Sequence, residues 1–283
     1  MGALAICRFA PWAVGIPPGG RQSVKVYLVN LDRSPERLAE VDAELKRTGV
    51  DYERVSAVDG SELSEDELKA NVSRFHTYRC IGRRLRPAEI GCALSHLKVH
   101  RMALAGRRRR WVVIEDDAVL DVDAWRTAVE TIERTDDPSV PTVWLLNDCH
   151  GLADPGRPSV VRLIGNQRGI LRTWGTVGYA LNAAAARRIL GLAWPVRYPA
   201  DAWSAYCRKG VDVRVVFPTA VRERPASSLT STVLDKKGHG RLWVWYGHFV
   251  KFRYVVCFWM DILSYRLGRT LGLGTAQNGG TEL

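Results

Sequence analysis

Three consecutive carboxylates, Glu115, Asp116 and Asp117, directly follow the apolar segment 111–114. Placing carboxylates beside a hydrophobic strand costs free energy, and adjacent acids repel one another, so a cation among them would offset both costs. Oxygen ligands suit a hard ion such as Mg²⁺ or Mn²⁺. Glu115 and Asp117 are the first candidates for metal ligands, because residues i and i+2 share a side of an extended segment. The alternative is an exposed acidic turn that caps the helix after it.

Motifs of several other enzyme classes are missing from the sequence. Neither a G-x-G-x-x-G motif nor a G-x-x-x-x-G-K-[ST] loop follows the first predicted strand, which removes the main support for a dinucleotide dehydrogenase or a P-loop enzyme. His96 and His100 are spaced to share a helix face, but the glutamate of the H-E-x-x-H zinc motif is absent. The six cysteines include no C-x-x-C pair, which argues against a zinc ribbon.

Alternating strand and helix patterns must position the three carboxylates. A β-branched run at 24–30 predicts a buried strand, Ser34 and Pro35 begin a helix, and Gly49 ends it before a strand at 50–58. The alternation continues with helices at 89–105, 122–134 and 183–192 and strands at 111–114, 142–146, 176–181 and 211–217. The predicted fold class is α/β, with a mainly parallel central sheet and helices on both faces. Ligands of such sheets bind outside the carboxyl ends of the strands, where the three acids fall.

Length and charge bound the organisation of the chain. It has 283 residues, and we expect a flexible leader at 1–22, one α/β domain at 23–235 and a basic, aromatic helical tail at 236–283. The formal charge of +11 suggests a polyanionic partner, which can be nucleic acid, an anionic membrane or a phosphate-bearing substrate. The domain holds 32 basic and 28 acidic residues, and the tail holds 7 and 2. A near-neutral domain with a basic tail favours an enzyme at a membrane over a nucleic-acid-binding protein.

The tail combines aromatic and basic residues. Eight aromatic residues lie between positions 243 and 259, and Lys251, Arg253, Arg266 and Arg269 are interleaved or follow closely. This mixture suits a helix in the headgroup region of an anionic membrane. The alternative is a C-terminal helix packed on the sheet. We therefore predict a cytoplasmic protein that lies peripherally on the inner face of the cytoplasmic membrane.

Five segments of the sequence, taken in their order along the chain, resemble a known family. They read VNLDRSPERL at 29–38, AVDG at 57–60, EIGCALSH at 89–96, VVIEDDAVL at 112–120 and GTVGYALNAAAARRIL at 175–190. Together they are similar to glycosyltransferase family 25, the lipopolysaccharide or lipooligosaccharide biosynthesis glycosyltransferases, which are related to the collagen galactosyltransferases. The similarity covers roughly residues 24 to 232.

The resemblance implies a GT-A-like fold and a metal-dependent hexosyltransferase. The implied donor is UDP-galactose or UDP-glucose, the implied metal Mn²⁺ or Mg²⁺, and the implied acceptor a glycan or glycolipid of lipopolysaccharide type. The implied reaction inverts the anomeric carbon by direct attack of an acceptor hydroxyl. A metal on the diphosphate would stabilise the departing UDP, and a carboxylate would still be needed to take the proton of the acceptor.

The resemblance also implies roles for residues around the donor. The group expected to hold the nucleotide, whose alternative role is helix capping and surface pairing, consists of Asn30, Asp32, Arg33 and Arg37. Asp116 is assigned to the ribose or the sugar, and Glu115 and Asp117 to the metal and UDP.

Two further pairs of residues receive expected roles. Ser95 and His96 lie in the EIGCALSH segment and are expected to border the donor pocket. The alternative is that Cys92 and Ser95 only permit close helix packing. Asp201 and Asp148 are rival candidates for the catalytic base, and Asp201 is preferred because it matches the late aspartate of the family.

Basic residues are concentrated in one segment of the domain. Residues 79–110 contain ten Lys or Arg and one acid. This segment could bind phosphates of the donor or of a lipopolysaccharide core, or it could be an ordinary solvated face.

Two other functions remain as alternatives. A nucleotidyltransferase-like metal enzyme is one of them, but 30–35 is not a Gly-rich phosphate loop. A basic nucleic-acid-binding protein without catalysis is the other, and we expect no nucleic-acid partner.

Overall fold

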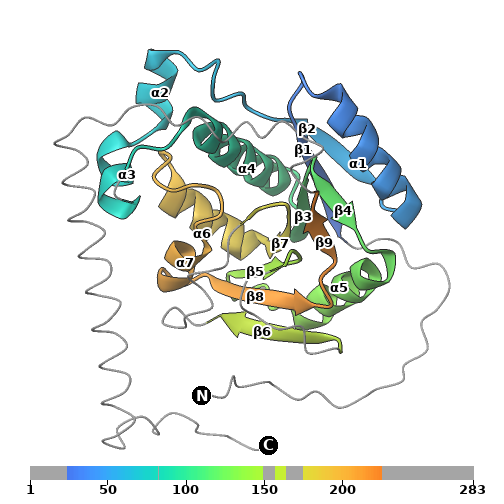
Figure 1. Cartoon of the computed structure of the whole chain (residues 1–283). Helices are drawn as coiled ribbons and strands as arrows, with labels where there is room; N and C mark the ends of the chain where they lie inside the picture. Colours follow the sequence, from blue (N-terminus) through green and yellow to red (C-terminus); the bar gives the residue numbers. More distant parts are fainter. Residues whose placement is uncertain (1–23, 82, 149–156, 164–174, 225–283) are drawn as a thin grey trace, which may run out of the picture. The chain divides into compact units, whose positions relative to one another are not determined.

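The computed structural model describes residues 24–81, 83–148, 157–163 and 175–224 (Figure 1). The predicted leader and tail both lie outside these residues. Of the described residues, those in 24–73 and 85–224 belong to one compact unit. Helix α3 (Arg74–Ile81) belongs to a second unit and is an eight-residue helix described by itself.

The first three elements form the predicted strand–helix–strand unit. β1 (Lys25–Asn30) and β2 (Tyr52–Ser56) pair in parallel and are joined by α1 (Pro35–Thr48). Pro35 occupies the first helical position, where its missing N–H costs nothing. Gly49 ends the helix at φ +70°, a left-handed conformation that glycine adopts without strain. This part of the sequence interpretation is confirmed.

The other elements build a seven-stranded sheet in the order β2-β1-β3-β7-β5-β8-β6 and a small ribbon in which β4 pairs with β9. In chain order they are α2 (Glu65–Asn71), α4 (Pro87–Ala105), β3 (Arg110–Glu115), β4 (Ala118–Leu120), α5 (Val122–Thr135), β5 (Thr142–Leu145), β6 (Ser159–Leu163), β7 (Gly178–Asn182), α6 (Ala183–Ala193), α7 (Trp203–Arg208), β8 (Asp212–Phe217) and β9 (Val221–Glu223). Strands β1, β2, β3, β5 and β8 run in one direction, while β7 and β6 run against their neighbours. The α/β class and the mainly parallel sheet are confirmed, and they agree with the GT-A-like fold.

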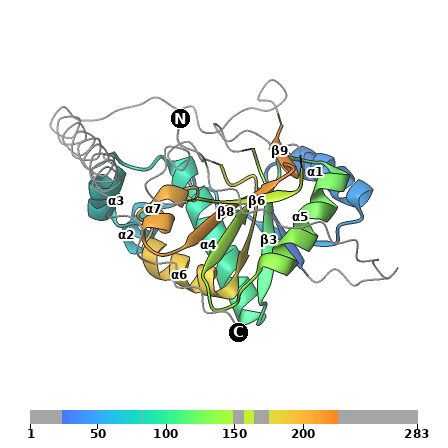
Figure 2. The same ribbon diagram turned by 90° about the horizontal axis from the view of Figure 1, so that it is seen from below.

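Helices cover both faces of the sheet, as predicted. Figure 2 shows α1 and α5 on one side and α4, α6 and α7 on the other. Strand alternation explains how each strand serves both layers, because successive side chains point to opposite faces. On β3, Val112 and Ile114 join the cluster with α1 and α5, while Trp111 lies 6.0 Å from the ring of His100 on α4.

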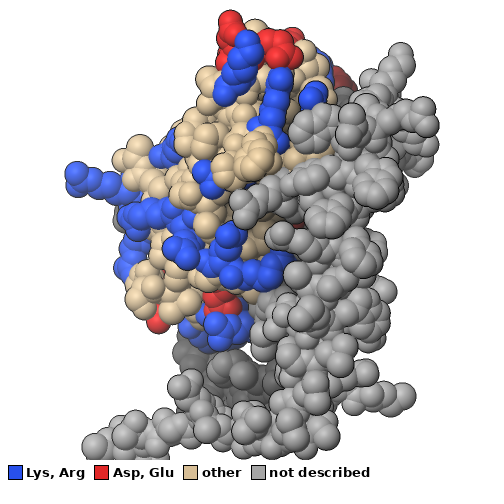
Figure 3. All heavy atoms as spheres, turned by 90° about the vertical axis from the view of Figure 1, so that its left-hand side faces the viewer, with Lys and Arg blue, Asp and Glu red and all other residues tan. Residues whose placement is uncertain are grey.

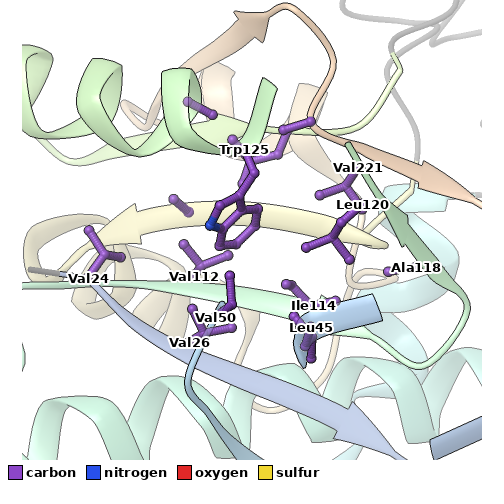
Figure 4. Packing of buried hydrophobic residues seen from close by; sticks show 14 of the residues in the cluster. Val24, Val26, Leu45, Val50, Val112, Ile114, Ala118, Leu120, Trp125 and Val221 are labelled. Atoms are coloured by element: carbon purple, nitrogen blue, oxygen red, sulfur yellow. The ribbon is translucent and has the colours of Figure 1, made fainter. Parts of the chain in front are cut away.

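The largest apolar cluster lies between the sheet, α1, α5 and the β4–β9 ribbon. Trp125 of α5 points into strand side chains such as Val112, and Leu45 of α1 lies by Ile114 (Figure 4). Ile114 and Leu45 are fully buried, so the end of β3 is held firmly from this side. The rigid end of β3 is the scaffold from which the three carboxylates project.

Two glycines let the loop after β2 touch α4. A Cβ on Gly60 would lie 1.7 Å from the carbonyl oxygen of Pro87, and one on Gly91 would lie 2.5 Å from that of Val58. The hydroxyl of Ser95 accepts a hydrogen bond from the N–H of Val58 at 2.8 Å and donates to the carbonyl of Gly91 at 2.7 Å. The sequence segments 57–60 and 89–96 therefore form one packed junction, which sets the position of α4 against β2.

Among the described residues, no helix is both long enough and apolar enough to cross a bilayer.

Candidate functional site

The site is built where β1 and β3 end. Asn30 is the last residue of β1 and Glu115 the last of β3. Asp116 and Asp117 form the turn between β3 and β4, so the extended backbone ends at Glu115. The expectation that Glu115 and Asp117 share a side because the segment is extended therefore does not apply. The side-chain amide of Asn30, which is 1% exposed, donates to Oδ2 of Asp116 at 2.8 Å. This bond ties the ends of two adjacent parallel strands together.

Arg37 links the two aspartates of the turn. It lies in the first turn of α1, and one terminal nitrogen of its guanidinium is 2.7 Å from Oδ1 of Asp116 and 3.1 Å from Oδ2 of Asp117. Burial raises the pKa of Asp116, although the bond from Asn30 and the charge of Arg37 oppose that rise. Burial and repulsion from Glu115 raise the pKa of Asp117 to about 7, again against the charge of Arg37. One arginine therefore only partly compensates the negative charge.

Two buried polar atoms of this cluster have no hydrogen-bond partner among the described residues. They are Oδ1 of Asp117 and Nε of Arg37. An unsatisfied buried polar atom is costly, and such atoms are expected where a ligand completes the site. A hard divalent cation fits the carboxylate oxygen, and an oxyanion fits the guanidinium N–H. The residues present are therefore compatible with a metal–diphosphate group.

Glu115 points to the opposite layer from the α1–α5 core. By strand alternation it shares the face of Trp111, and there it meets α4 and the residues before β7. Its Oε1 accepts a hydrogen bond from the hydroxyl of Thr176 and lies 2.9 Å from Nε2 of His96. Burial would raise the pKa of Glu115, but the hydrogen bond and charge of His96 and the bond from Thr176 lower it overall. Glu115 is thus held as a carboxylate in a fixed orientation.

Cys92, His96 and Glu115 each place one ligand atom within 4.8 Å of the other two, a spacing that a metal ion can bridge. Their donors are already used within the protein, because Nδ1 of His96 lies 2.8 Å from the hydroxyl of Tyr179 and Sγ of Cys92 lies 3.8 Å from Glu115. Burial and the charge of Glu115 raise the pKa of Cys92 well above its ordinary value, so its thiol stays protonated. We assign this group to positioning Glu115.

The two candidate bases lie in different surroundings. Asp201 accepts a hydrogen bond at 3.1 Å from the backbone N–H of Gly175, the residue before Thr176. Burial raises its pKa, and the charge of Glu115 raises it further. Asp148 is exposed and follows the buried Asn147 at the end of β5. The structure therefore places Asp201 close enough to Glu115 for the charge of Glu115 to act on it, while Asp148 is exposed.

The predicted nucleotide-holding residues divide into two groups. Asp32 accepts bonds from Ser56 at 2.6 Å and from Arg54, and these bonds lower its pKa. Nε of Arg54 also donates to Oδ1 of Asn30 at 3.0 Å, so Asp32 is joined to the carboxylate cluster. Arg33 instead forms an ion pair with Asp59 and is half exposed, as the surface-pairing alternative describes.

Ser95 and His96 also have different roles, although they are adjacent in the sequence. The hydroxyl of Ser95 is used between two backbone groups, as the packing alternative describes. His96 is 3% exposed and contacts Glu115 directly. The structure therefore connects His96, and not Ser95, to the carboxylate cluster.

Sequence reasoning missed three residues of the site. Arg54 and Thr176 contact Asn30 and Glu115 across long sequence separations, which no local pattern reveals. Gly175 has φ +93°, a conformation that favours glycine, and its backbone serves both Asp201 and the indole N–H of Trp203. The signal for Gly175 and Thr176 was present in the family-like segment 175–190, which was read only as a strand and a helix.

Comparison with protein families identifies the segment that carries this cluster. Residues 23–147 match the model of glycosyltransferase family 25, described as an LPS biosynthesis protein. Over this segment, the chain is similar to glycosyltransferase family 25. The matched residues include Asn30, Arg37, Glu115, Asp116 and Asp117, so the family segment contains the whole strand-end cluster.

Several curated proteins share part of this sequence. Procollagen galactosyltransferase 2 of Mus musculus is 26% identical over 174 residues, which are 59% of this chain and 27% of that protein. A glycosyltransferase 25 family member of Aedes aegypti is 35% identical over 95 residues, 32% of this chain and 16% of that protein. The probable inactive glycosyltransferase 25 family member 3 of Rattus norvegicus is 30% identical over 176 residues, 59% of this chain and 29% of that protein. The chain thus spans less than a third of the length of these relatives.

A solved structure with some likeness to this chain is the inositol-1-phosphate CTP transferase from T. maritima. The two are 13% identical with a TM-score of 0.38, and the match covers 81% of this chain and 97% of that chain.

Proposed function

We propose that the chain is an inverting hexosyltransferase that moves galactose or glucose from a UDP-sugar to a saccharide acceptor of lipopolysaccharide type. The match of residues 23–147 to glycosyltransferase family 25 supports a glycosyltransferase, and the donor, the acceptor and the metal are proposed in addition. The observation that carries the proposal is the buried, partnerless Oδ1 of Asp117 next to Arg37, at the carboxyl ends of β1 and β3. A site with one open carboxylate oxygen and one open guanidinium N–H fits a cation and a diphosphate together.

The residues around the donor would divide the work of binding it. Asp117 would ligate a divalent cation, and Glu115, whose charge acts on Asp117, would add to the negative potential at the cation. A bound cation would act as a Lewis acid toward the departing diphosphate. Nε of Arg37 would donate to a phosphate oxygen. Asn30 and Arg54 hold Asp116 and Asp32 in place, which leaves these two carboxylates as acceptors for sugar or ribose hydroxyls.

Asp201 is the proposed base of the reaction. In the transfer, the acceptor oxygen forms a bond to the anomeric carbon while the bond from that carbon to the phosphate oxygen breaks, and the acceptor proton passes to the carboxylate. A carboxylate whose pKa is raised by burial is a better proton acceptor than a free one. The bond from the backbone N–H of Gly175 orients Asp201 for this role.

The test of the donor and metal is UDP release from a panel of UDP-sugars with Mn²⁺. Asp117→Asn should lower turnover by about 100-fold or more, as expected for loss of a group that stabilises the transition state. Asp123→Asn is the matched control, because Asp123 is an exposed carboxylate on α5. Equal turnover in the wild type and D117N would remove Asp117 from the metal site. Failure to bind any UDP-sugar would reject the donor class.

Binding measurements give a second readout that does not depend on the acceptor. Electron paramagnetic resonance of free Mn²⁺ reports how much metal the protein holds with and without UDP. We expect the wild type and D123N to bind Mn²⁺ with UDP, and D117N to lose this binding. Retained binding in D117N would contradict the assignment even if the protein were a catalytically inactive family member.

We also propose that the protein works at the inner face of the cytoplasmic membrane. The support is the basic, aromatic composition of 236–283 and the glycolipid nature of the proposed acceptor. The full chain should sediment with vesicles that contain anionic lipid, and a chain without 236–283 should not. Equal sedimentation of the two proteins would reject the role of this segment.

A further inference from the structure

A hollow lies where the parallel strands begin, at the opposite end of β1 and β3 from the carboxylate cluster. Its volume is about 320 Å³, and its walls include Lys25 at the start of β1, Asp51 just before β2 and Arg110 at the start of β3. Val24 and the three residues 107–109 complete the lining. We call it the strand-start hollow.

The strand-start hollow is separate from the donor site. Lys25 and Asn30 are the two ends of β1, and Arg110 and Glu115 are the two ends of β3. Strands of this length place their ends roughly 16 Å apart. The arginines at 107–110 therefore lie at the opposite ends of β1 and β3 from the carboxylate cluster.

The lining of the hollow contains five cations, Lys25 and the arginines at 107–110, and one acid, Asp51. Arg110 pairs with Asp136 at 3.0 Å, and Lys25 with Glu53 at 3.3 Å. In the part of the chain that the structure describes, no ion pair involves Arg107 or Arg109, and both are exposed. Neighbouring cations without counter-charges repel one another, and an anion between them would remove that cost.

General surface charge does not account for this arrangement. Figure 3 shows Lys and Arg side chains spread over one face of the described residues, so basic residues as such are common on this protein. The hollow differs because consecutive arginines converge on one concavity. Arg107 has φ 55°, a left-handed conformation uncommon for residues other than glycine, and this turn brings the run to the hollow. The negative end of the α4 dipole amounts to about half a charge, which is too little to balance the run.

We propose that the strand-start hollow binds a phosphate group that does not belong to the donor. Guanidinium groups bind phosphate oxygens through paired, charge-assisted hydrogen bonds, and a concave site with several of them favours this anion over a lone carboxylate. The phosphate can come from a soluble phosphorylated compound or from a phospholipid headgroup. The site is independent of the proposed transfer reaction and does not require it.

The test uses the full chain and two double variants of equal charge change. Arg107→Gln with Arg109→Gln removes the two exposed cations of the hollow. Arg134→Gln with Arg187→Gln is the control, because these arginines are exposed on α5 and α6 and do not line the hollow. One arm titrates inorganic pyrophosphate by calorimetry without divalent cations. The other measures flotation with vesicles of phosphatidylglycerol and phosphatidylcholine.

We expect R107Q/R109Q to bind at least one of the two probes about tenfold more weakly than R134Q/R187Q, since two charge-assisted hydrogen bonds are lost. A selective loss of pyrophosphate binding identifies a soluble phosphate as the source, and a selective loss of flotation identifies a lipid headgroup. Equal binding by the two double variants in both arms would overturn the proposal, because binding would then follow net charge and not the hollow.

Discussion

At the residue scale, the direction of each carboxylate decides its partners. Glu115 is the last strand residue and follows the alternation of β3 toward α4, where His96 and Thr176 hold it. Asp116 and Asp117 follow the turn and face α1, where Arg37 joins them. Three adjacent acids therefore occupy two different environments. The hydrogen bond and charge of His96 lower the pKa of Glu115 against the effect of burial, whereas burial and the charge of Glu115 raise the pKa of Asp117.

Replacing Arg37 should destabilise the fold far more than replacing Arg33. Arg37→Gln would leave Asp116 and Asp117 without their cation in a buried setting, which costs about 3–5 kcal/mol. Arg33→Gln, the matched control, removes a half-exposed ion pair with Asp59 and should cost at most about 1 kcal/mol. Urea unfolding at pH 7 measures both. Equal midpoints would show that Arg37 is not needed to balance the two aspartates.

Asp117 should make the metal-free protein less stable as the pH rises. Its pKa is about 7 in the folded protein and about 3.8 when unperturbed, so the folded state favours the protonated acid. The stability that protonation contributes is complete below about pH 4 and is lost as the pH rises through 7. Between pH 5 and 8 the loss is about 3 kcal/mol at most.

The variant Asp117→Asn keeps a neutral group of the same shape and should lose correspondingly less stability over this range. Urea unfolding in EDTA at pH 5 and pH 8 provides the comparison. Adding Mn²⁺ with UDP at pH 8 should stabilise the wild type and not D117N. If the two proteins lost the same stability between the two pH values, Asp117 would not be the group that titrates.

At the element scale, the sequence predicted the scaffold well where local chemistry determines it. Pro35 and Gly49 mark the ends of α1, and the apolar runs of β1 and β3 predict buried strands. The strand predicted at 176–181 is present as β7 at Gly178–Asn182, but the sequence does not predict its antiparallel direction, because direction depends on the path of the chain between strands. The three-residue strands β4 and β9 were missed, since such short segments carry no periodicity.

In the candidate site, too, the features set by local sequence could be predicted and the long-range contacts could not. The placement of Glu115, Asp116 and Asp117 at a strand end came from a local pattern, an apolar run followed by acids. The contacts of Thr176 and Arg54 could not be predicted, because their partners lie 61 and 24 residues away in the sequence. Tertiary packing, and not local propensity, selects such pairs.

The junction between the loop after β2 and α4 should tolerate no side chain at Gly91. In Gly91→Ala the new Cβ would lie 2.5 Å from the carbonyl oxygen of Val58 and 2.6 Å from the nitrogen of Gly60, and both are backbone atoms that cannot turn away. The expected loss of stability is about 1–3 kcal/mol.

Gly191→Ala is the control for this change, because a Cβ there meets no atom within 4 Å and Gly191 lies inside α6. It should stabilise the protein by about 0.5–1 kcal/mol. Thermal unfolding of both variants measures the difference. A G91A protein as stable as the wild type would show that the junction is looser than these contacts indicate.

At the scale of the whole molecule, the charge of +11 is divided among places with different roles. Within the first compact unit, Arg37 and Arg54 serve the carboxylate cluster at the ends of the parallel strands. Arg107 and Arg109 line the hollow at the beginnings of the same strands. The length of the strands thus separates a mixed-charge site, where Oδ1 of Asp117 and Nε of Arg37 lack partners among the described residues, from a mainly cationic hollow. The two should recognise different groups.

This separation predicts that the two sites act independently. Energetic coupling between groups more than about 10 Å apart that share no partners is usually within 0.5 kcal/mol. The affinity for UDP with Mn²⁺ should therefore change less than about twofold in R107Q/R109Q, whereas R37Q should lower it strongly through the lost phosphate contact. Calorimetric titration of UDP into each variant tests this directly. A tenfold loss in R107Q/R109Q would mean that strands β1 and β3 transmit a change from one end to the other, and the strand-start hollow would then be a regulatory site of the transferase.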